Sequence, residues 1–254
     1  MFERDLSEVL ASPGRLRPVF QPILSLATGT IVGYEGFSRF VMSPRRPPDT
    51  WFTEASRVGM GARLQAHAIT QILGSAARAG LPAGTFLALN VSPRYLDHPA
   101  VGAAFSMAEP TSLVIELTEE EAVLDYQALR RAMVPYLKRG VRFAVDDAGA
   151  GFASMRHVIE LQPALVKLDA WLISGIRNRR TLRAFLRSIN DFTTEIGAVL
   201  VAEGVESTSD LAVLAETGFQ ILAQGFAIGK PGPPWGSGTA ASINAWREGS
   251  ENRR

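Results

Sequence analysis

Short apolar runs alternate with segments of helical periodicity along almost the whole of this chain, and this rhythm limits the folds that it can adopt. The apolar runs predict eight β-strands, at residues 18–26, 31–40, 85–91, 113–117, 142–145, 165–168, 198–202 and 219–222. From the third strand onward a helical pattern lies between each strand and the next, which indicates parallel pairing through βα units. Barrels of eight such units typically take about 250 residues, and this chain has 254. We therefore expect a single barrel.

The first two strands break this rhythm, because only the four residues from Ala27 to Thr30 separate them. A connection that short cannot carry a parallel crossover, so the two strands should form an antiparallel hairpin. The predicted fold class is therefore α/β: a TIM-like (β/α)8 barrel with an antiparallel first strand. Two of its helices are predicted at 62–79 and 121–139, where Gly80 and Gly140 would end them in left-handed caps.

The chain contains no low-complexity linker that would divide it into separate folding units. We expect an amino-terminal lead-in at 1–16, the barrel domain at 17–232, and a polar carboxy-terminal tail at 233–254 that is partly helical or disordered.

The densest basic run lies within residues 176–189. It contains Arg177, Arg179, Arg180, Arg183 and Arg187. Leu182, Leu186 and Ile189 recur there at helical spacing, which predicts an amphipathic helix with its arginines on the opposite face. That face would meet either solvent or a second subunit.

Composition excludes several kinds of site and partner. The net charge of +1, from 26 Lys+Arg and 25 Asp+Glu, gives no reason to expect a nucleic acid polymer as partner. The apolar runs fall short of the ~20 residues that span a bilayer, and the acids near the start do not fit a signal peptide. We therefore expect no membrane partner and a cytoplasmic location. Because cysteine is absent and His67, His98 and His157 are scattered, any metal must be held mainly by oxygen.

Acidic or amide side chains follow six of the predicted strands, at the point where each strand ends. These residues are Glu35, Asn90, Glu116, the pair Asp146 and Asp147, Asp169 and Glu203. Strand ends of a barrel share one mouth, and barrel enzymes place their chemistry at the carboxyl ends of the strands. A single acid in such a position often does no more than solvate the strand end. The six together predict a common site.

So many carboxylates at one mouth would repel one another unless cations bind or several of their pKa values rise. Carboxylates with one amide, and without thiolates, favour Mg²⁺ or Mn²⁺. The adjacent pair Asp146 and Asp147 can serve two ions, and two-metal sites suit phosphodiester hydrolysis. An unrelated metal-dependent lyase barrel is the alternative.

Lys167 lies two residues before Asp169, so both side chains should leave an extended strand on the same face. A lysine in a barrel can form a Schiff base if its pKa falls. Neighbouring carboxylates raise the pKa of a lysine instead. We therefore expect a charged ammonium that faces a phosphate oxygen or the attacking hydroxide.

An ordered set of motifs resembles the EAL-domain cyclic di-GMP phosphodiesterase family from Phe20 to Pro231. The matching segments are FQPI at 20–23, GYEGFSR at 33–39, LNVS at 89–92, IELTE at 115–119, VDD at 145–147, VKLD at 166–169, AEGVE at 202–206, AQGF at 223–226 and KP at 230–231. The resemblance implies a barrel with an antiparallel opening strand. It also implies hydrolysis of cyclic di-GMP to linear pGpG.

The resemblance further implies a role for each matched residue. Metal coordination is implied for Glu35, Asn90, Glu116, Asp146, Asp147 and Asp169, of which Asp169 serves the second metal or orders the lysine. Catalytic roles are implied for four residues. Lys167 would hold the attacking water or a phosphate oxygen, and Glu203 would be the general base. Gln224 would lie near the metals and the phosphate, and Glu119 would steady the loop after the aspartate pair. Substrate contacts are implied for Gln21, Arg39 and Glu206.

The implied cofactors are two Mg²⁺ or Mn²⁺ ions, with Ca²⁺ expected to inhibit. The implied partners are cyclic di-GMP, a second copy of the chain in a homodimer, and a separate regulatory protein. Structural roles remain open for four of the residues. Gln21 would then form a hydrogen bond within the hairpin, and Arg39 would pair with a neighbouring acid. Glu119 and Glu206 would lie at the first turn of the following helices, where an acid interacts favourably with the helix dipole.

Two segments depart from the family pattern. Glu35 is followed by Gly36 and Phe37 where the family usually has Ala and Leu, which puts the fit of the substrate in doubt more than metal binding. The loop after the aspartate pair carries Ala148 and Ala150, and so lacks an aromatic anchor and a hydroxyl. Because this loop positions Asp147, a displaced metal ligand would lower the rate of catalysis. The alternative function is therefore a catalytically weak or silent cyclic di-GMP receptor, or a protein-interaction module.

Overall fold

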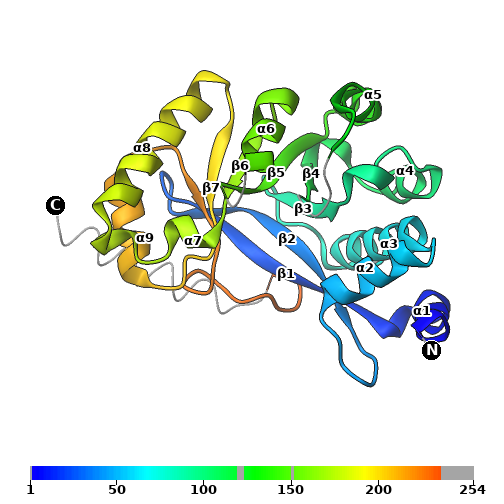
Figure 1. Cartoon of the computed structure of the whole chain (residues 1–254). Helices are drawn as coiled ribbons and strands as arrows, with labels where there is room; N and C mark the ends of the chain where they lie inside the picture. The colour runs from blue at the N-terminus through cyan, green and yellow to red at the C-terminus, as the bar shows by residue number, and fades with distance from the viewer. Residues whose placement is uncertain (1, 119–122, 150–151, 236–254) are drawn as a thin grey trace.

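The computed structural model describes residues 2–118, 123–149 and 152–235. Eight strands close into one barrel in the order of the sequence (Figure 1). They are β1 (Leu16–Ser25), β2 (Thr30–Phe40), β3 (Phe86–Val91), β4 (Leu113–Leu117), β5 (Arg142–Ala148), β6 (Leu165–Leu168), β7 (Val199–Ala202) and β8 (Leu222–Ala223). β1 runs antiparallel to both of its neighbours, β2 and β8, and the other pairs are parallel. The predicted barrel and its antiparallel first strand are confirmed.

Helices surround the barrel on the outside (Figure 1). They are α1 (Phe2–Ala11), α2 (Pro48–Arg57), α3 (Gly61–Ala79), α4 (Pro99–Phe105), α5 (Tyr126–Leu137), α6 (Phe152–Leu161), α7 (Ala170–Ile173), α8 (Arg180–Glu195) and α9 (Thr208–Glu216). Among the residues described, none of these helices is both long and apolar enough to cross a membrane.

The predicted helix boundaries hold for one helix and fail for the other. α3 matches the prediction within one residue, and Gly80 follows it with a φ of +69°. The helix expected at 121–139 begins only at Tyr126, because the side chain of Asp125 accepts a hydrogen bond from the backbone N–H of Ala128 at 2.9 Å and caps the helix there. Glu121 lies outside the described residues.

Two strand predictions also need correction. The strand expected at 219–222 is displaced, and only Leu222 and Ala223 pair with β7 and β1. Phe219 still belongs to the turn after α9, because its N–H donates to Thr217 Oγ1 at 3.2 Å. β5 continues to Ala148, three residues past its predicted end, and its register against β6 shifts between Val145 and Ala148. The aspartate pair therefore lies within an irregular strand end.

Apolar side chains fill the middle of the barrel. This middle layer contains Ile23, Ala88, Val114, Ala144 and Val201, and each of them is at most 1% exposed. A larger core lies between the strands and the surrounding helices. The middle layer separates the barrel into two ends with different chemistry.

The flanking segments add a smaller cluster. α1 buries Leu6 and Val9 beside α2 and α3, in a core that includes Trp51. At the other end of the described chain, the ring of Trp235 lies 5.2 Å from that of Phe20 and 4.5 Å from that of Tyr34. Both segments are therefore anchored on the barrel domain.

Candidate functional site

A cavity of about 990 Å³ opens at the carboxyl ends of the strands. Its wall includes Gln21, Glu35, Arg39, Asn90, Asp146, Asp147, Lys167, Asp169, Glu203, Glu206 and Gln224. These residues come from seven different strands and the segments that follow them. Glu119, the remaining predicted catalytic residue, lies outside the described residues.

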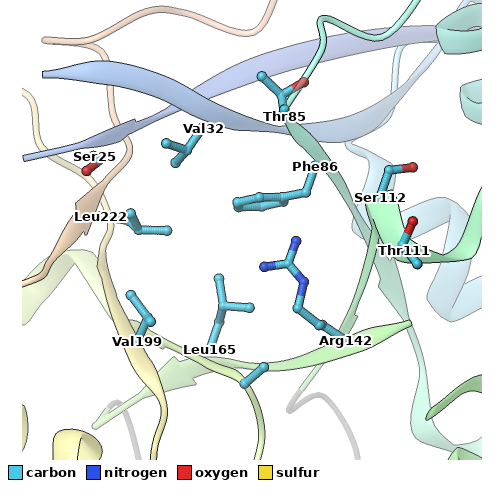
Figure 2. Close-up of a pocket in the computed structure, with 12 residues that line it drawn as sticks. Ser25, Val32, Thr85, Phe86, Thr111, Ser112, Arg142, Leu165, Val199 and Leu222 are labelled. Atoms are coloured by element: carbon cyan, nitrogen blue, oxygen red, sulfur yellow. The ribbon is translucent and has the colours of Figure 1, made fainter. Parts of the chain in front are cut away.

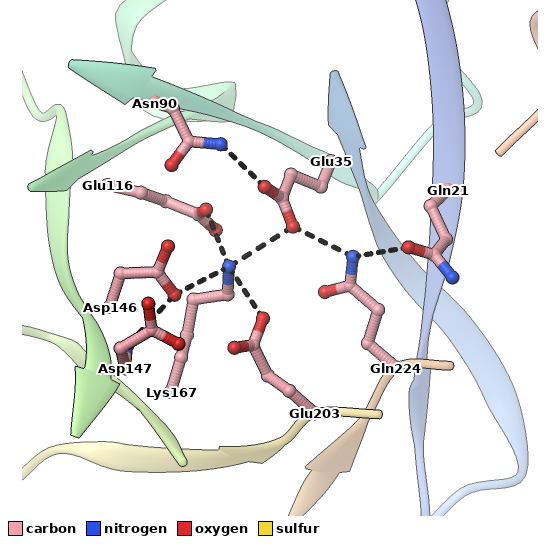
Figure 3. A network of polar contacts seen from close by, with 9 residues as sticks. All are labelled: Gln21, Glu35, Asn90, Glu116, Asp146, Asp147, Lys167, Glu203 and Gln224. Carbon is pink, nitrogen blue, oxygen red and sulfur yellow. Dashed lines mark hydrogen bonds and ion pairs between the residues drawn. The ribbon is translucent and has the colours of Figure 1, made fainter. Parts of the chain in front are cut away.

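Lys167 stands at the centre of the predicted acids (Figure 3). Its Nζ lies 2.7 Å from Glu116 Oε2, 2.8 Å from Glu203 Oε1, and 3.1 Å from both Glu35 Oε2 and Asp146 Oδ1. Lys167, Glu35 and Glu116 are each only 2% exposed. Four carboxylates thus converge on one ammonium, which leaves an excess of negative charge wherever they are ionised.

This crowding changes the pKa values of the cluster. Burial alone would lower the pKa of Lys167, but the surrounding carboxylates, Asp146 and Glu116 foremost, outweigh it and hold the pKa well above the ordinary lysine value. Burial and the charge of Glu35 raise the pKa of Glu116 well above its usual range, against the pull of Lys167. These directions agree with the expectation of a charged lysine, and they match the alternative in which acids at the mouth have raised pKa values.

Glu203 shows the same effect with a defined value. Burial raises its pKa to about 8, with further upward contributions from Asp146 and Glu35, although the ammonium of Lys167 opposes the shift. A carboxyl group with this pKa changes its protonation state close to neutral pH. It is therefore suited to accept or donate a proton during catalysis.

A second chain of hydrogen bonds extends from Glu35 across the mouth. Asn90 Nδ2 donates to Glu35 Oε1 at 2.6 Å, and Gln224 Nε2 donates both to Glu35 Oε2 at 2.8 Å and to Gln21 Oε1 at 3.1 Å. Gln21 Nε2 in turn donates to the carbonyl of Gly229 at 2.9 Å. The structural role left open for Gln21 was a hydrogen bond within the hairpin. Its amide instead donates to the segment after β8.

The aspartate pair occupies a bend at the end of β5. Asp147 has a φ of +51°, and its backbone N–H donates to Asp146 Oδ1 at 3.1 Å. Ligand atoms of Asp146, Asp147 and Glu203 lie within 4.8 Å of one another. The three carboxylates are therefore close enough together to bind one metal ion.

Three predicted residues lie apart from the Lys167 cluster. Asp169 Oδ1 accepts a hydrogen bond from the N–H of Trp171 at 2.7 Å and so caps α7. Arg39 is exposed at the cavity and makes no ion pair with any residue in the described part of the chain. Glu206 is also exposed there, and Ser207, not Glu206, caps α9.

Gln65 is a site residue that the sequence interpretation missed. Its Nε2 donates to the carbonyl of Asn90 at 2.9 Å, and its Oε1 accepts from the N–H of Ser92 at 3.1 Å. This side chain from α3 thus forms hydrogen bonds with the backbone of β3 on both sides of Val91, and these bonds fix the position of Asn90. A signal was present, since Gln65 is a polar residue beside the apolar stripe of its helix.

Gly36 has a packing reason that the sequence did not show. A Cβ at this position would lie 2.5 Å from Ile72 Cγ2 of α3, closer than such contacts allow. Ile72 therefore fills the space that an alanine methyl group would take. The departure from the family pattern is matched by a neighbouring side chain and does not leave a gap.

The donor set fits divalent cations. Carboxylate oxygens converge on the point that the ammonium of Lys167 holds, so the same oxygens can converge on a metal ion. Gln224 Oε1 is buried and has no hydrogen-bond partner among the described residues, which leaves an oxygen acceptor unused in the site. Oxygen donors without thiolates or histidine favour Mg²⁺ or Mn²⁺.

Comparison with known proteins places these features in a family. The model of the EAL domain matches residues 3–231. The chain is 30% identical over 239 residues to the probable cyclic di-GMP phosphodiesterase PdeI of Escherichia coli, a match that covers 87% of this chain and 29% of PdeI. It is 26% identical over 241 residues to the cyclic di-GMP phosphodiesterase RocR of Pseudomonas aeruginosa, across 87% of this chain and 58% of RocR.

Solved structures agree on the fold. Klebsiella pneumoniae BlrP1, in a complex with calcium and cyclic di-GMP, superposes with a TM-score of 0.75 at 28% identity, over 87% of this chain and 57% of BlrP1. The chain spans less than two thirds of the length of each of these relatives. Its fold, its ordered motifs and the match over residues 3–231 show that the chain belongs to the EAL domain family, and it is related to cyclic di-GMP phosphodiesterases.

Proposed function

We propose that this chain is a metal-dependent phosphodiesterase that hydrolyses cyclic di-GMP to linear pGpG. The observation that carries the proposal is the convergence of four carboxylates on Lys167, at 2.7 to 3.1 Å, beside a cavity of about 990 Å³. A cavity of this size holds a small-molecule ligand. The relatives named above as cyclic di-GMP phosphodiesterases supply the substrate class.

Two divalent cations would be held by the acids and the amide at the mouth. The residues proposed to hold them are Glu35, Asn90, Glu116, Asp146, Asp147 and Asp169, with Glu203 beside the aspartate pair. Bound Mg²⁺ or Mn²⁺ would lower the pKa of water and stabilise charge on the phosphate oxygens. Ca²⁺ should occupy the site without supporting turnover.

The side chains of the protein have distinct tasks in this reaction. The oxygen of water bonds to phosphorus, the bond from phosphorus to the 3′ oxygen breaks, and one proton passes from the water to the leaving oxygen. Glu203 can take up that proton when it is ionised, and its pKa of about 8 in the metal-free protein places its change of protonation state close to neutral pH. Lys167 keeps its charge and can donate hydrogen bonds to the water or to a phosphate oxygen.

Residues at the wider part of the cavity would orient the dinucleotide. The exposed guanidinium of Arg39 can bind a phosphate, and the carboxylate of Glu206 can accept hydrogen bonds from the edge of a guanine. Gln21 and Gln224, which bond each other, would hold the substrate beside Glu35. These contacts are part of the proposal.

A catalytically silent receptor is the second candidate, and the loop after the aspartate pair favours it. Ala148 and Ala150 carry no side chain that could anchor this loop through a hydrogen bond. Ala148 itself is fully buried, and its carbonyl accepts from the N–H of Asp169 at 3.4 Å, so the loop is anchored at its first residue. A receptor would bind cyclic di-GMP and release it unchanged.

One experiment separates the two candidates. The purified chain is incubated with cyclic di-GMP and Mn²⁺, and pGpG is measured by chromatography. Glu35→Gln serves as the blank, and Glu54→Gln, on the surface of α2, is the matched control. Product above the blank in the wild type and in Glu54→Gln supports the phosphodiesterase. Product no higher than the blank removes it.

Binding is then measured by calorimetry in Ca²⁺, where turnover should not interfere. Heat of binding without hydrolysis in Mn²⁺ supports the receptor. The absence of both heat and product removes both candidates.

A homodimer also stays a proposal, as does a separate regulatory protein. α8 begins at Arg180, later than the predicted run at 176, because Ile176–Asn178 form a separate short 3-10 turn. The helix buries Leu182, Leu186 and Ile189, while Arg180 and Arg187 are exposed on its other face. Arg183 departs from the expectation, because it is half-buried and donates to the carbonyls of Ile176 and Arg177. A dilution series by light scattering that gives only monomer would count against the dimer.

A further inference from the structure

The opposite end of the barrel also contains a cavity, of about 530 Å³. Its wall includes Val32, Phe86, Arg142, Leu165, Val199 and Leu222, whose side chains point into the space between the strands (Figure 2). All but one of these six side chains are apolar, and the hydroxyl residues Ser25, Thr85, Thr111 and Ser112 complete the wall at the rim. We call this cavity the barrel floor.

Arg142 is the exception, and no carboxylate of the described residues forms an ion pair with it. It is the first residue of β5, and its guanidinium lies 4.9 Å from the centre of the Phe86 ring. In the part of the chain that the structure describes, it makes no hydrogen bond and no ion pair with a carboxylate. Burial lowers the pKa of Arg142, yet a guanidinium stays charged at neutral pH.

Two features of the backbone hold this arrangement in place. A Cβ at Gly33 would lie 2.6 Å from atoms of the Phe86 ring, so glycine lets the ring lie flat against β2. Beside it, the register of β1 and β2 shifts between Ile23 and Leu24, and Val32 is left without a partner in the ladder. Val32 points into the floor as a result. The ring and the guanidinium therefore lie in a shaped space.

Three of the four hydroxyl groups at the rim already donate to acceptors among the described residues. Thr85 Oγ1 donates to the carbonyl of Pro82 at 2.6 Å, and Ser112 Oγ donates to that of Glu109 at 2.8 Å. Thr111 Oγ1 lies 3.3 Å from Glu109 Oε1 and donates to it. Ser25 Oγ accepts from the N–H of Thr28. The guanidinium is thus the strongest side-chain donor left for a ligand.

We propose that the barrel floor binds a small organic carboxylate with an apolar body. One guanidinium with paired N–H donors matches one carboxylate group, and the apolar wall matches a hydrocarbon or aromatic body. A phosphate, with its higher charge and stronger hydration, would need further donors that the wall does not supply. The site is independent of the phosphodiesterase site, because the middle layer of the barrel lies between them.

The test uses phenylacetate as the probe and the full chain, with binding followed by calorimetry and by ligand-observed NMR. We expect a Kd on the order of 1 mM or tighter, which corresponds to about 4 kcal/mol. Acetate, which lacks the apolar body, and phenylacetamide, which lacks the charge, should each bind at least about tenfold more weakly.

Three variants locate the site. Arg142→Met should weaken phenylacetate binding at least about tenfold, and Arg142→Lys should retain part of the affinity. Val199→Phe keeps Arg142 and fills the cavity from its rim, so it should also abolish binding. Arg180→Met removes an exposed arginine of α8 and should change nothing.

Several results would overturn the proposal. One is the absence of binding by the wild type up to about 10 mM phenylacetate, far above the expected Kd. Another is equal binding of acetate and phenylacetate. A third is affinity that survives in both Arg142→Met and Val199→Phe, with folding checked by thermal melting. If Arg142→Met does not fold, Val199→Phe and the two ligand analogues still decide the question.

Discussion

The two ends of the barrel hold their cations in opposite surroundings. At the mouth, the ammonium of Lys167 is enclosed by four carboxylates. At the floor, the guanidinium of Arg142 has an aromatic ring and apolar side chains around it, and no carboxylate among the described residues. The mouth therefore has more anions than its cation can neutralise, while the floor has a cation without an anion.

A single strand contributes to both ends. On β5, Arg142 points to the floor, Ala144 belongs to the middle layer, and Asp146 contacts Lys167 at the mouth. These alternate residues share the inner face of the strand. The alternation of side chains along β5 therefore places a cation at the floor, a methyl group in the middle layer and an acid at the mouth. The apolar middle layer separates these two charges, so we expect each end of the barrel to bind its own counterion.

Removal of each cation should break this comparison most clearly. Lys167→Met leaves buried carboxylates without their partner, and we expect it to lower the free energy of unfolding of the metal-free protein by about 3–5 kcal/mol. Arg142→Met removes no ion pair, and we expect a loss below about 1 kcal/mol. Urea unfolding at pH 8 with a chelator measures both values.

Divalent metal ions provide the control for this pair of variants. Added Mg²⁺ should restore more stability to Lys167→Met than to Arg142→Met, because only the first lacks a cation among the acids. Equal losses in the two variants, or a larger loss for Arg142→Met, would contradict the contrast between mouth and floor.

Gln65 offers a test that is confined to the mouth. Gln65→Leu leaves the carbonyl of Asn90 and the N–H of Ser92 unpaired, so it should lower the free energy of unfolding by about 1–3 kcal/mol. Because Asn90 loses its support, Mg²⁺ affinity should fall about 10–100-fold, as it does when groups behind metal ligands are removed. Calorimetry gives the affinity.

The matched control is Gln71→Leu on the same helix, since the side chain of Gln71 makes no hydrogen bond with the described residues. Gln71→Leu should leave the free energy of unfolding and the Mg²⁺ affinity unchanged. Phenylacetate binding at the floor should stay the same in both variants. A shared loss of Mg²⁺ affinity would show that α3, and not the amide of Gln65, supports the site.

Each end also depends on one glycine, and alanine substitutions should separate the ends further. Gly36→Ala places a methyl group 2.5 Å from Ile72 Cγ2, and Gly33→Ala places one 2.6 Å from the Phe86 ring. Each should cost about 1–3 kcal/mol of stability, as overpacking does. Gly36→Ala should weaken Mg²⁺ binding only, and Gly33→Ala phenylacetate binding only.

Gly14→Ala serves as the control, because a Cβ there meets no atom within 4 Å. Relief by a second substitution is a stricter check on the packing argument. The loss in Gly36→Ala should shrink when Ile72→Ala is already present, by about 1 kcal/mol or more in a double-mutant cycle. Additive losses would mean that Ile72 does not set the requirement for glycine.

The sequence predicted the mouth well because the rule that positions it is local. A polar residue that directly follows the apolar run of a barrel strand lies toward the carboxyl end of that strand, so Glu35, Asn90 and Glu116 could be assigned to one mouth from the sequence. The antiparallel hairpin followed with equal certainty from the four residues between β1 and β2. These inferences needed no knowledge of which helix packs where.

The features that sequence reasoning missed depend on tertiary contacts. Gln65 lies 25 residues from Asn90, and only the packing of α3 against the barrel brings them together. Asp169 stays a proposed ligand at the mouth, but its second role was also missed, because only the turn after β6 brings its Oδ1 to the N–H of Trp171 at the start of α7. The floor depends on the bulge at Val32, which reverses the alternation that a regular strand would show.

The pH dependence of binding gives the smallest expected effect and again separates the ends. With a pKa of about 8, Glu203 is about 90% protonated at pH 7 and about 10% at pH 9 in the metal-free protein. A divalent cation needs the ionised carboxylate, so binding at pH 7 must release this proton. Mg²⁺ affinity should therefore rise about tenfold, or about 1.4 kcal/mol, from pH 7 to pH 9.

At the floor the guanidinium stays charged over this range, as does the carboxylate of the probe, so phenylacetate affinity should not change between pH 7 and pH 9. Calorimetry in two buffers with different enthalpies of ionisation counts the protons released at pH 7, and Glu203→Gln should release about one fewer than the wild type. The raised pKa of Glu116 adds to the release in both proteins, so their difference isolates Glu203. An identical count in the two proteins would mean that the proton comes from another group, and that Glu203 does not hold one at the mouth.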